Sequence, residues 1–543
     1  MQAAGGDAGD HGAGNRDRPS ARLRLVTAGA TLGLFLLGFV NTSFDSILRE
    51  DGLTYLRQAF RMLEGHWGAT THPMGWSALL AGGISVLGLD GLPEGMVLAR
   101  MLSVLLTALC VLPFAGFARR VAGERAAALA VFAFAASVTW MRLAGIAYAD
   151  PLFLFLTLCA LHVAAGATDG RGGPLIAAAV LASLAYYAKP NGLFVLVALC
   201  LFALHVRRRV GLGLLFVAWL PLVFALVSLP HLALRAETFG SPFSYGENSK
   251  YFVDSYSQVW DRDVPVPSLM DYLRAHTPSE WFDKFVRSGV LKVGWFFLKE
   301  IGVLWTTLLV LAGWRLWKSW TSTLALPLLT LVVFLGGLVP VFHVFGDQRY
   351  LAVTLPFVFV LGAWAFFEST DGRPSQRLWT LALLLALAAP VPIAFVSGQL
   401  RFRTAPGAVQ PPHVRDAWAR WAVRHLADPV GILEGEDLLT VALDEARTAG
   451  ELPPAGGGRA RIFRTHRPAS VDTLSKALAA LRRRGVEYLL VDSRNLDRRP
   501  YLREIYEPAG AALVEQVQSF RSTPEDRWQI ADMDVFRILP APD

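Results

Sequence analysis

The sequence predicts a polytopic α-helical membrane protein with a small α/β domain at its C-terminal end. Of its 543 residues, 53% are hydrophobic and only 17% are charged, and the mean hydropathy is +0.40. A soluble globular protein is rarely so apolar, and many of the apolar runs are long enough to enter a bilayer. Beyond residue 400 short strand-like runs replace them, and this change predicts the second domain.

Residues 1–24 are rich in Gly, Ala, Asp and Arg and are expected to form a disordered cytoplasmic tail. The apolar run that follows has Arg22 and Arg24 before it and no small-x-small cleavage site after it. We interpret it as an uncleaved signal anchor that leaves the N-terminus inside.

The apolar runs predict about 11 membrane spans, within a range of 10 to 13. Several are shorter than the roughly 20 residues that a perpendicular helix needs, so these are expected to be tilted, broken or re-entrant. The predicted spans lie near residues 25–41, 97–117, 126–146, 151–167, 174–187, 192–206, 211–232, 293–314, 323–345, 350–367 and 378–397.

Basic residues give these spans an orientation. With the N-terminus inside, every loop assigned to the cytoplasm is basic, as the positive-inside rule predicts. The membrane domain should then occupy residues 25–400, with external loops at 42–96 and 233–292 and an external α/β domain at 401–543. The net charge of +7 comes from clusters between spans, so nucleic acid is not an expected partner, whereas membrane lipids are.

The first external loop is predicted to lie on the membrane surface. The apolar run at 72–89 would add a span that inverts every later loop, so an interfacial hairpin is expected there. Before it, alternating steps of three and four predict an amphipathic helix with an apolar face of Leu53, Leu56, Phe60, Leu63 and Trp67. Asp51 stands just before this face. Its position suits an N-cap, a catalytic carboxylate, or both.

The C-terminal residues predict strands within 430–433, 486–494 and 533–539 and a helix within 470–485, which is closed by a Gly stop signal. The apolar face of this helix comprises Val471, Leu474, Leu478 and Leu481. No phosphate-binding P-loop, zinc-protease or hydrolase motif occurs in the chain. All three cysteines lie in apolar runs, which supports neither a disulfide nor a cysteine metal site.

Ionisable residues at the outer ends of the spans are the strongest functional signal, because such groups are costly to desolvate. They are Glu50 with Asp51, His72 in "THPMG", Asp150 in "YADPLF", Lys189 in "AKPNG", and Asp347 with Arg349 in "GDQRYL". Each also has a structural interpretation. Asp150 and His72 precede prolines, as residues at helix starts and turns do. Lys189, Arg349 and Arg142 can be interfacial side chains that reach the headgroups, and Arg142 can also be a phosphate partner.

The order of these motifs resembles the GT-C superfamily of polyprenyl-phosphate-sugar-dependent glycosyltransferases. The resemblance is to bacterial relatives of the dolichyl-phosphate-mannose protein mannosyltransferases and of the lipid A aminoarabinose transferase. It covers about residues 40–370 and rests on "DGLTYLRQAFRMLEG", "THPMG", "ADPLF", "KPNG" and "RYL". The tail also resembles the extracytoplasmic domains of such enzymes. One departure is that the second acid of the family's pair falls at Gly52, with Glu50 on the other side of Asp51.

The resemblance implies a GT-C-like membrane glycosyltransferase that moves a hexosyl or pentosyl group from a polyprenyl-phosphate donor to an acceptor hydroxyl on the outer face. It implies Asp51 as the base and Arg349, helped by Lys189, as the phosphate clamp. The residues expected to position substrates are Asp150, His72, Glu50 and Tyr55. The acceptor stays open among lipid, glycan and protein. The sequence predicts no metal site and no certain cofactor, but it leaves a divalent cation open.

The expected location is a bacterial inner (plasma) membrane, with the C-terminal domain in the periplasm or outside the cell. The main alternative is a transporter or lipid flippase with a periplasmic accessory domain, in which charges would line a path. We find no two-fold repeat in the sequence, and the charges gather at one face, which favours the transferase. A catalytically inactive scaffold whose tail binds a partner is a third interpretation.

Overall fold

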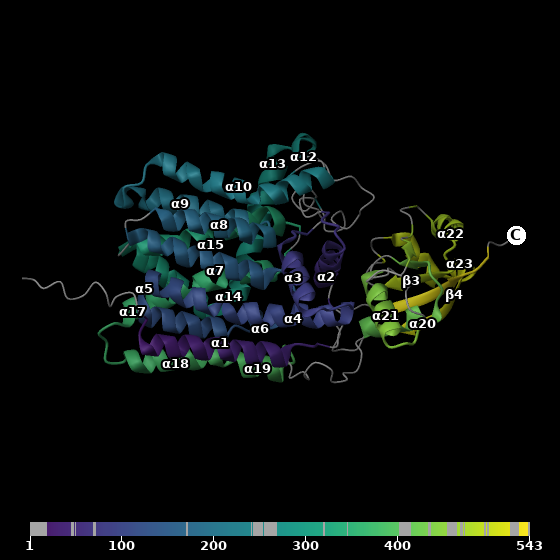
Figure 1. Ribbon diagram of the computed structural model, residues 1–543, viewed down its shortest axis with the longest axis horizontal. Coiled ribbons are helices and arrows are strands. Elements are labelled where there is room, and N and C mark those ends of the chain that lie inside the picture. The colour runs from purple at the N-terminus through teal and green to yellow at the C-terminus, as the bar shows by residue number, and fades with distance from the viewer. Residues whose placement is uncertain are drawn as a thin grey trace, which may run out of the picture.

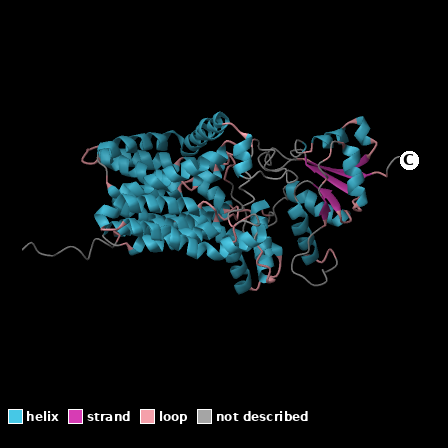
Figure 2. Ribbon diagram, turned by 90° about the horizontal axis from the view of Figure 1, so that it is seen from above, coloured by secondary structure: helices cyan, strands magenta, loops and turns pink. Residues whose placement is uncertain are grey.

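The protein is a long helical bundle with a compact α/β domain beyond one end, as the computed structural model shows (Figure 1). All strands lie in that end domain (Figure 2). The fold class predicted from the sequence is therefore confirmed. The structure describes residues 19–44, 48, 50–68, 72–169, 172–239, 242, 254, 269–318, 321–344, 346–400, 414–432, 436–452, 464–466, 468, 471, 473–492, 496, 499–521 and 532–540.

The bundle consists of helices, most of them apolar and lying along one direction (Figure 1). They are α1 (Ala21–Asn41), α2 (Glu50–Leu63), α3 (Gly75–Leu87), α4 (Leu92–Leu109), α5 (Val111–Ala135), α6 (Val138–Ala144), α7 (Asp150–Ala165), α8 (Gly173–Ala188), α9 (Gly192–Val210), α10 (Leu214–Phe239), α12 (Leu269–Ala275), α13 (Pro278–Trp281), α14 (Gly289–Lys318), α15 (Ala325–Phe342), α16 (Arg349–Ala352), α17 (Leu355–Thr370), α18 (Gln376–Ala388) and α19 (Pro390–Val396).

Six helical stretches of the described residues are long and apolar enough to cross a membrane, so the chain is a multi-pass membrane protein. They are Ala21–Asn41, Leu92–Ala135, Leu214–Thr238, Pro278–Lys318, Ser322–Phe342 and Gln376–Val396. Four shorter apolar helices, α3, α7, α8 and α17, pack among them. The 44-residue stretch contains a turn at Gly123, where φ is 82°, beside the predicted cytoplasmic arginines. The number of spans remains a prediction.

The predicted hairpin at 72–89 forms a single helix, α3, which is followed directly by α4. Its 13 residues extend about 20 Å at 1.5 Å per residue, less than the thickness of a hydrocarbon core. Helix α3 packs against α2, α4 and α8. It therefore lies among the helix ends that carry the motifs described above.

The C-terminal domain has a five-stranded mixed sheet with the order β2-β1-β3-β5-β4. Strand β1 is parallel to β2 and β3, whereas β5 is antiparallel to β3 and β4. The strands are β1 (Val430–Ile432), β2 (Thr465–His466), β3 (Tyr488–Asp492), β4 (Val514–Phe520) and β5 (Met533–Ile538), and the helices are α20 (Val414–His425), α21 (Glu436–Thr448), α22 (Leu474–Arg483) and α23 (Pro508–Ala511). Strands β1, β3 and β5 coincide with the predicted ones. The face predicted for α22 is buried, although the helix begins only at Leu474.

Helices α2 and α3 lie at the end of the bundle that faces the C-terminal domain (Figure 1). Helix α21 of that domain packs against α4 and α2. One hydrophobic cluster, which we call the shared core, includes Leu53 and Phe60 of α2, Met96 of α4, and Leu439 and Ala442 of α21. The domain and the adjacent end of the bundle are therefore joined by a continuous apolar interior.

Candidate active site

Asp51 lies in the first turn of α2, which begins at Glu50. It is the second residue of the helix, so the interpretation of Asp51 as the N-cap is wrong. Leu53, Leu56 and Phe60 bury the opposite face of α2 in the shared core, as their spacing predicts. This packing fixes the rotation of the helix and leaves the Asp51 side chain 32% exposed.

Two basic side chains meet the two carboxylate oxygens of Asp51. Arg349 donates Nη1 to Oδ2 over 3.0 Å, and His72 Nε2 lies 3.8 Å from Oδ1. These contacts join the first external loop to a turn almost three hundred residues later. The predicted proximity of Asp51, His72 and Arg349 is present in the structure.

Arg349 is the first residue of the short helix α16 and is held on several sides. Asp347 accepts a hydrogen bond from the backbone N of Arg349 at 2.9 Å, and its Oδ2 lies 3.4 Å from Nε. The guanidinium lies over the rings of Tyr148 and Tyr350, at 4.8 and 5.2 Å from their centroids. A guanidinium held between an acid and two aromatic faces is oriented before any ligand arrives.

Asp150 and Lys189 form a second ion pair beside the first. Asp150 begins α7, and Lys189 follows the last residue of α8. Lys189 Nζ donates to Asp150 Oδ1 over 2.6 Å, and the Asp150 side chain is only 9% exposed. The other oxygen, Oδ2, is buried and has no hydrogen-bond partner among the described residues. A buried carboxylate oxygen of this kind can accept a hydrogen bond from a bound hydroxyl.

The two ion pairs face one cavity, with about 410 Å³ of empty space including its open mouth. Tyr55 also lines it, with its ring 4.9 Å from that of His72. The complete lining is Asp51, Tyr55, His72, Pro73, Tyr148, Asp150, Lys189, Pro190, Asn191, Arg349 and Tyr350. Six of the seven predicted site residues are therefore gathered here. The side chain of Glu50 lies outside the described residues.

Besides Pro73 and Pro190, three polar lining residues were not predicted as site residues, namely Tyr148, Asn191 and Tyr350. Each lies inside a motif that was recognised, two positions from Asp150, two from Lys189 and next to Arg349, respectively. Tyr350 contacts both cations, since its hydroxyl lies 3.4 Å from Arg349 Nη2 and its ring lies 5.3 Å from Lys189 Nζ. The tyrosine directly after the arginine of "RYL" is the signal in the sequence that could have suggested this role.

The backbone before Tyr148 explains the glycine at position 52. Ala147 has a positive φ of 60°, which is uncommon for a residue with a side chain, and its carbonyl accepts a hydrogen bond from Trp76 Nε1 at 3.0 Å. A Cβ at Gly52 would stand 3.3 Å from the Ile146 carbonyl oxygen and 3.5 Å from that of Ala147. The second acid of the family's pair therefore has little room here.

Burial and neighbouring charges act on Asp51 in opposite directions. Burial raises the pKa of its carboxyl, but Arg349, His72 and Lys189 favour the charged form more strongly. The pKa of Asp51 is therefore lowered from its ordinary value of 3.8. In the unliganded site Asp51 is a stable carboxylate bound to a cation.

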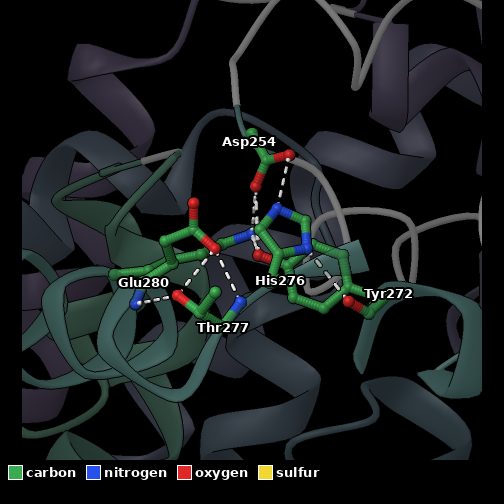
Figure 3. A network of polar contacts seen from close by, with 6 residues as sticks. Asp254, Tyr272, His276, Thr277 and Glu280 are labelled. Atoms are coloured by element: carbon green, nitrogen blue, oxygen red, sulfur yellow. Dashed lines mark hydrogen bonds and ion pairs between the residues drawn. The ribbon is translucent and has the colours of Figure 1, made fainter. Parts of the chain in front are cut away.

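A separate polar network lies in the segment predicted to be the long external loop (Figure 3). Asp254 accepts hydrogen bonds from the Tyr272 hydroxyl at 3.0 Å and from Lys284 Nζ at 2.8 Å, and its other oxygen lies 3.1 Å from His276 Nε2. The rings of Tyr272 and His276 stack at 4.1 Å. None of these four residues lines the cavity.

The described residues of the site do not form a cluster of metal ligands. In the described part of the chain, no three His, Cys, Asp or Glu side chains gather as ligands of one ion. Asp51 and Asp150 instead engage Arg349 and Lys189. Cationic side chains thus occupy the positions beside both carboxylates, and the donor set does not fit a divalent cation.

Residues 71–233 match the family model described as dolichyl-phosphate-mannose-protein mannosyltransferase. This segment contains His72, Asp150 and Lys189 of the cavity. No curated protein sequence matches the chain.

Solved GT-C structures share the fold at low sequence identity. The oligosaccharyltransferase of Archaeoglobus fulgidus, solved with zinc and sulfate, is 14% identical with a TM-score of 0.59, covering 87% of this chain and 68% of that one. ArnT from Cupriavidus metallidurans, bound to undecaprenyl phosphate, is 12% identical with a TM-score of 0.55, covering 96% of this chain and all of that one. The resemblance is therefore confirmed at the level of the fold.

Proposed function

We propose that this chain, which has the GT-C fold, is a membrane glycosyltransferase. It would move a sugar from a polyprenyl-phosphate donor to an acceptor hydroxyl at the outer face of the membrane. The observation that carries the proposal is the Asp51–Arg349 pair, 3.0 Å apart in a cavity that also holds Asp150 and Lys189. ArnT and an archaeal oligosaccharyltransferase with related folds were solved with undecaprenyl phosphate and dolichol-phosphate, respectively.

Arg349 and Lys189 supply the positive charge that a departing phosphate needs. The acceptor oxygen bonds to the anomeric carbon as the carbon–oxygen bond to phosphate breaks, and the electron pair stays on polyprenyl phosphate. A guanidinium can donate two hydrogen bonds to this phosphate, and its orientation between Tyr148 and Tyr350 limits the reorganisation required. Such a clamp would stabilise the transition state by about 3 to 4 kcal/mol, as one oxyanion-hole donor does.

Asp51 would take the proton of the acceptor hydroxyl. A carboxylate tied to Arg349 is a weak base, but the donor phosphate competes for the same guanidinium. When Arg349 turns to the phosphate, burial remains as the main influence on Asp51, and its pKa rises toward a value that suits a base. Binding of the donor would thus activate the base.

Asp150 would recognise a hydroxyl of the sugar or the acceptor. Its Oδ1 is engaged by Lys189, while Oδ2 is available as an acceptor. His72 and Tyr55, which pack ring against ring on the other side of Asp51, would orient the same substrate. The donor sugar is a hexosyl or pentosyl group, and the acceptor is a lipid, a glycan or a protein.

This function places the cavity at the outer face of a bacterial inner membrane, with residues 401–543 in the periplasm or outside the cell. The basic loops predicted for the cytoplasmic side support this orientation, as do α2 and α3, which lie between the bundle and the C-terminal domain (Figure 1).

The test is sugar transfer by the full chain in proteoliposomes, with a panel of radiolabelled polyprenyl-phosphate hexoses and pentoses. Acceptors would come from membranes of cells that lack the chain. Arg349→Gln should reduce the rate about a hundredfold or more, because it removes the clamp, and Asp51→Asn should reduce it similarly. Both variants should still bind detergent micelles and elute as folded protein.

A matched control is Arg287→Gln. This exposed arginine does not line the cavity, and its Nη1 lies 3.4 Å from Asp283 Oδ1. The transfer rate of this variant should equal that of the natural chain. Undiminished transfer by Asp51→Asn would remove this residue from the mechanism. Movement of labelled lipid across the bilayer without sugar transfer would favour the flippase.

A further inference from the structure

The short connection between α6 and α7, residues 145–149, places two side chains in the cavity. The ring centroid of Tyr148 lies 4.8 Å from Cζ of Arg349. Asp150, the first residue of α7, accepts the 2.6 Å hydrogen bond from Lys189. The conformation of the connection therefore decides where an aromatic wall and an acidic wall of the cavity stand.

The connection is strained at Ala147, one residue before Tyr148. Its φ is 60°, and no other non-glycine residue in the described part of the chain has a positive φ. A left-handed backbone crowds the Cβ of an L-residue against its own chain, so an alanine ordinarily avoids it. Strain of this kind persists only where the surrounding structure imposes it. The conformation of Ala147 must therefore be held by contacts from outside the connection.

Trp76 of α3 supplies such a contact. Its Nε1 donates to the Ala147 carbonyl oxygen over 3.0 Å, and both residues are fully buried. A buried carbonyl without a donor is unfavourable, so this bond opposes any rotation that turns the carbonyl away. The indole is itself fixed, because α3 packs against α2, α4 and α8.

Helix α2 lies against the same backbone. A Cβ at Gly52 would stand 3.3 Å from the Ile146 carbonyl oxygen, and Gly52 directly follows Asp51. The strained connection thus adjoins the helix that carries Asp51 and leads into Tyr148 and Asp150. Its backbone therefore sets the spacing of three cavity residues.

We propose that Trp76 is a positioning residue of the transferase, which holds the strained connection and so keeps Tyr148 and Asp150 in place. This inference rests on the proposed function. Trp76 does not line the cavity and acts through the backbone. The indole holds the carbonyl of Ala147, the left-handed turn directs Tyr148, and the tyrosine ring orients the guanidinium that binds the phosphate. Without the indole bond, the charged residues would all be present but would be misplaced.

The experiment measures sugar transfer by the full chain in proteoliposomes, for Trp76→Phe with and without Ala147→Gly. Trp76→Phe removes the donor and keeps an aromatic ring, so transfer should fall about tenfold to a hundredfold, as misplacement of a site by about 1 Å does. Glycine adopts a positive φ without strain, so the double variant should regain most of the rate. Glycine fills none of the space left by the indole, and rescue therefore separates positioning from packing.

Trp140→Phe is the matched control. Trp140 of α6 is equally buried, but its Nε1 has no hydrogen-bond partner among the described residues. The substitution should leave transfer nearly unchanged and should gain nothing from Ala147→Gly. Equal rates for Trp76→Phe and the natural chain would overturn the inference. Equal losses in the two phenylalanine variants, or a loss in Trp76→Phe that Ala147→Gly does not reverse, would also overturn it.

Two further measurements keep the test decisive. If Trp76→Phe gives too little folded protein to assay, the comparison is made on folded yield, which Ala147→Gly should restore. Hydrogen exchange at residues 145–150 should quicken in Trp76→Phe and not in Trp140→Phe, and unchanged exchange in both would overturn the inference whether or not sugar is transferred. Failure of the natural chain to transfer any sugar would instead count against the proposed function.

Discussion

At the scale of single residues, the proposed function gives Asp51 two requirements that conflict before the donor binds. Its charge is stabilised by Arg349 at 3.0 Å, which makes the carboxylate a weak base. The same arginine is the best candidate for the donor phosphate, so one guanidinium links donor binding to the strength of the base. This coupling explains why Asp51, the proposed base, would contact Arg349, the residue proposed to bind the phosphate.

The coupling predicts different acid limits for two kinetic parameters. The acid limb of kcat/KM reports the free enzyme, in which the pKa of Asp51 is lowered, whereas that of kcat reports the complex, in which Arg349 has turned to phosphate. Because a base loses activity as pH falls through its pKa, the kcat limb should lie at the higher pH. Arg349→Gln should move the kcat/KM limb upward. Coincident limbs in the natural chain would contradict the coupling.

Gly52 allows a second prediction at this scale. Gly52→Asp restores the adjacent acid of the family pattern, yet its Cβ would press on the Ile146 carbonyl, in the segment that leads to Tyr148. We expect a loss of about 1 to 3 kcal/mol in stability and a lower transfer rate, with no catalytic gain. Thermal unfolding and transfer assays would measure both.

The control for this substitution is Gly68→Asp, because a Cβ at Gly68 meets nothing within 4 Å. It should leave stability and rate nearly unchanged. A rise in transfer rate with Gly52→Asp would show that a second carboxylate does fit and contributes to catalysis.

At the scale of elements, α3 positions Lys189 through backbone contact with α8. A Cβ at Gly75, the first residue of α3, would stand 2.7 Å from the carbonyl carbon and oxygen of Tyr187. Tyr187 lies two residues before Lys189, which follows the end of α8. The glycine of "THPMG" is thus explained by this close approach, which sets the distance between two motifs that are far apart in the chain.

Gly75→Ala should therefore displace α3 or the Lys189 turn. The added methyl group should introduce about 1 to 3 kcal/mol of strain. We expect this strain to lower the melting temperature and to weaken the binding of undecaprenyl phosphate. Gly82→Ala on the same helix is the control, because a Cβ there meets nothing within 4 Å and alanine is the better helix former. Equal effects of the two substitutions would show that the contact with Tyr187 is unimportant.

At the scale of the whole molecule, the C-terminal domain shares a hydrophobic interior with α2, the helix that carries Asp51. Helix α21 packs on α2 and α4, and the shared core runs through all three. A second cluster of the domain, around α22, is separate and includes Leu478. The domain should therefore steady α2, and with it Asp51, through the shared core only.

Two matched substitutions separate these cores. Leu439 and Leu478 are both fully buried, the first in the shared core and the second in the separate cluster. Each change to Ala should cost about 2 to 5 kcal/mol locally. Only Leu439→Ala should speed hydrogen exchange in α2 and lower sugar transfer severalfold. Equal exchange in α2 for both variants would show that the domain does not support the catalytic helix.

Prediction from the sequence succeeded where the signal is local. Long apolar runs predicted the helices of the bundle, and β1, β3 and β5 were found from their apolar residues. Strand β2 was missed because it has only two residues, and β4 was missed because most of its residues are exposed and polar, as suits an edge strand. The limits of α22 were displaced because Val471 fits the apolar period but precedes the helix.

The sequence by itself determined that the chain enters a membrane, and it predicted that the ionisable motifs lie on one side and carry the chemistry. Only the tertiary structure decided that Asp51 contacts Arg349 and that Lys189 contacts Asp150. It also decided that Tyr148 and Tyr350 hold the guanidinium between them. Hydropathy and motif order are properties of neighbouring residues, whereas these contacts depend on the packing of helices that are distant in the chain.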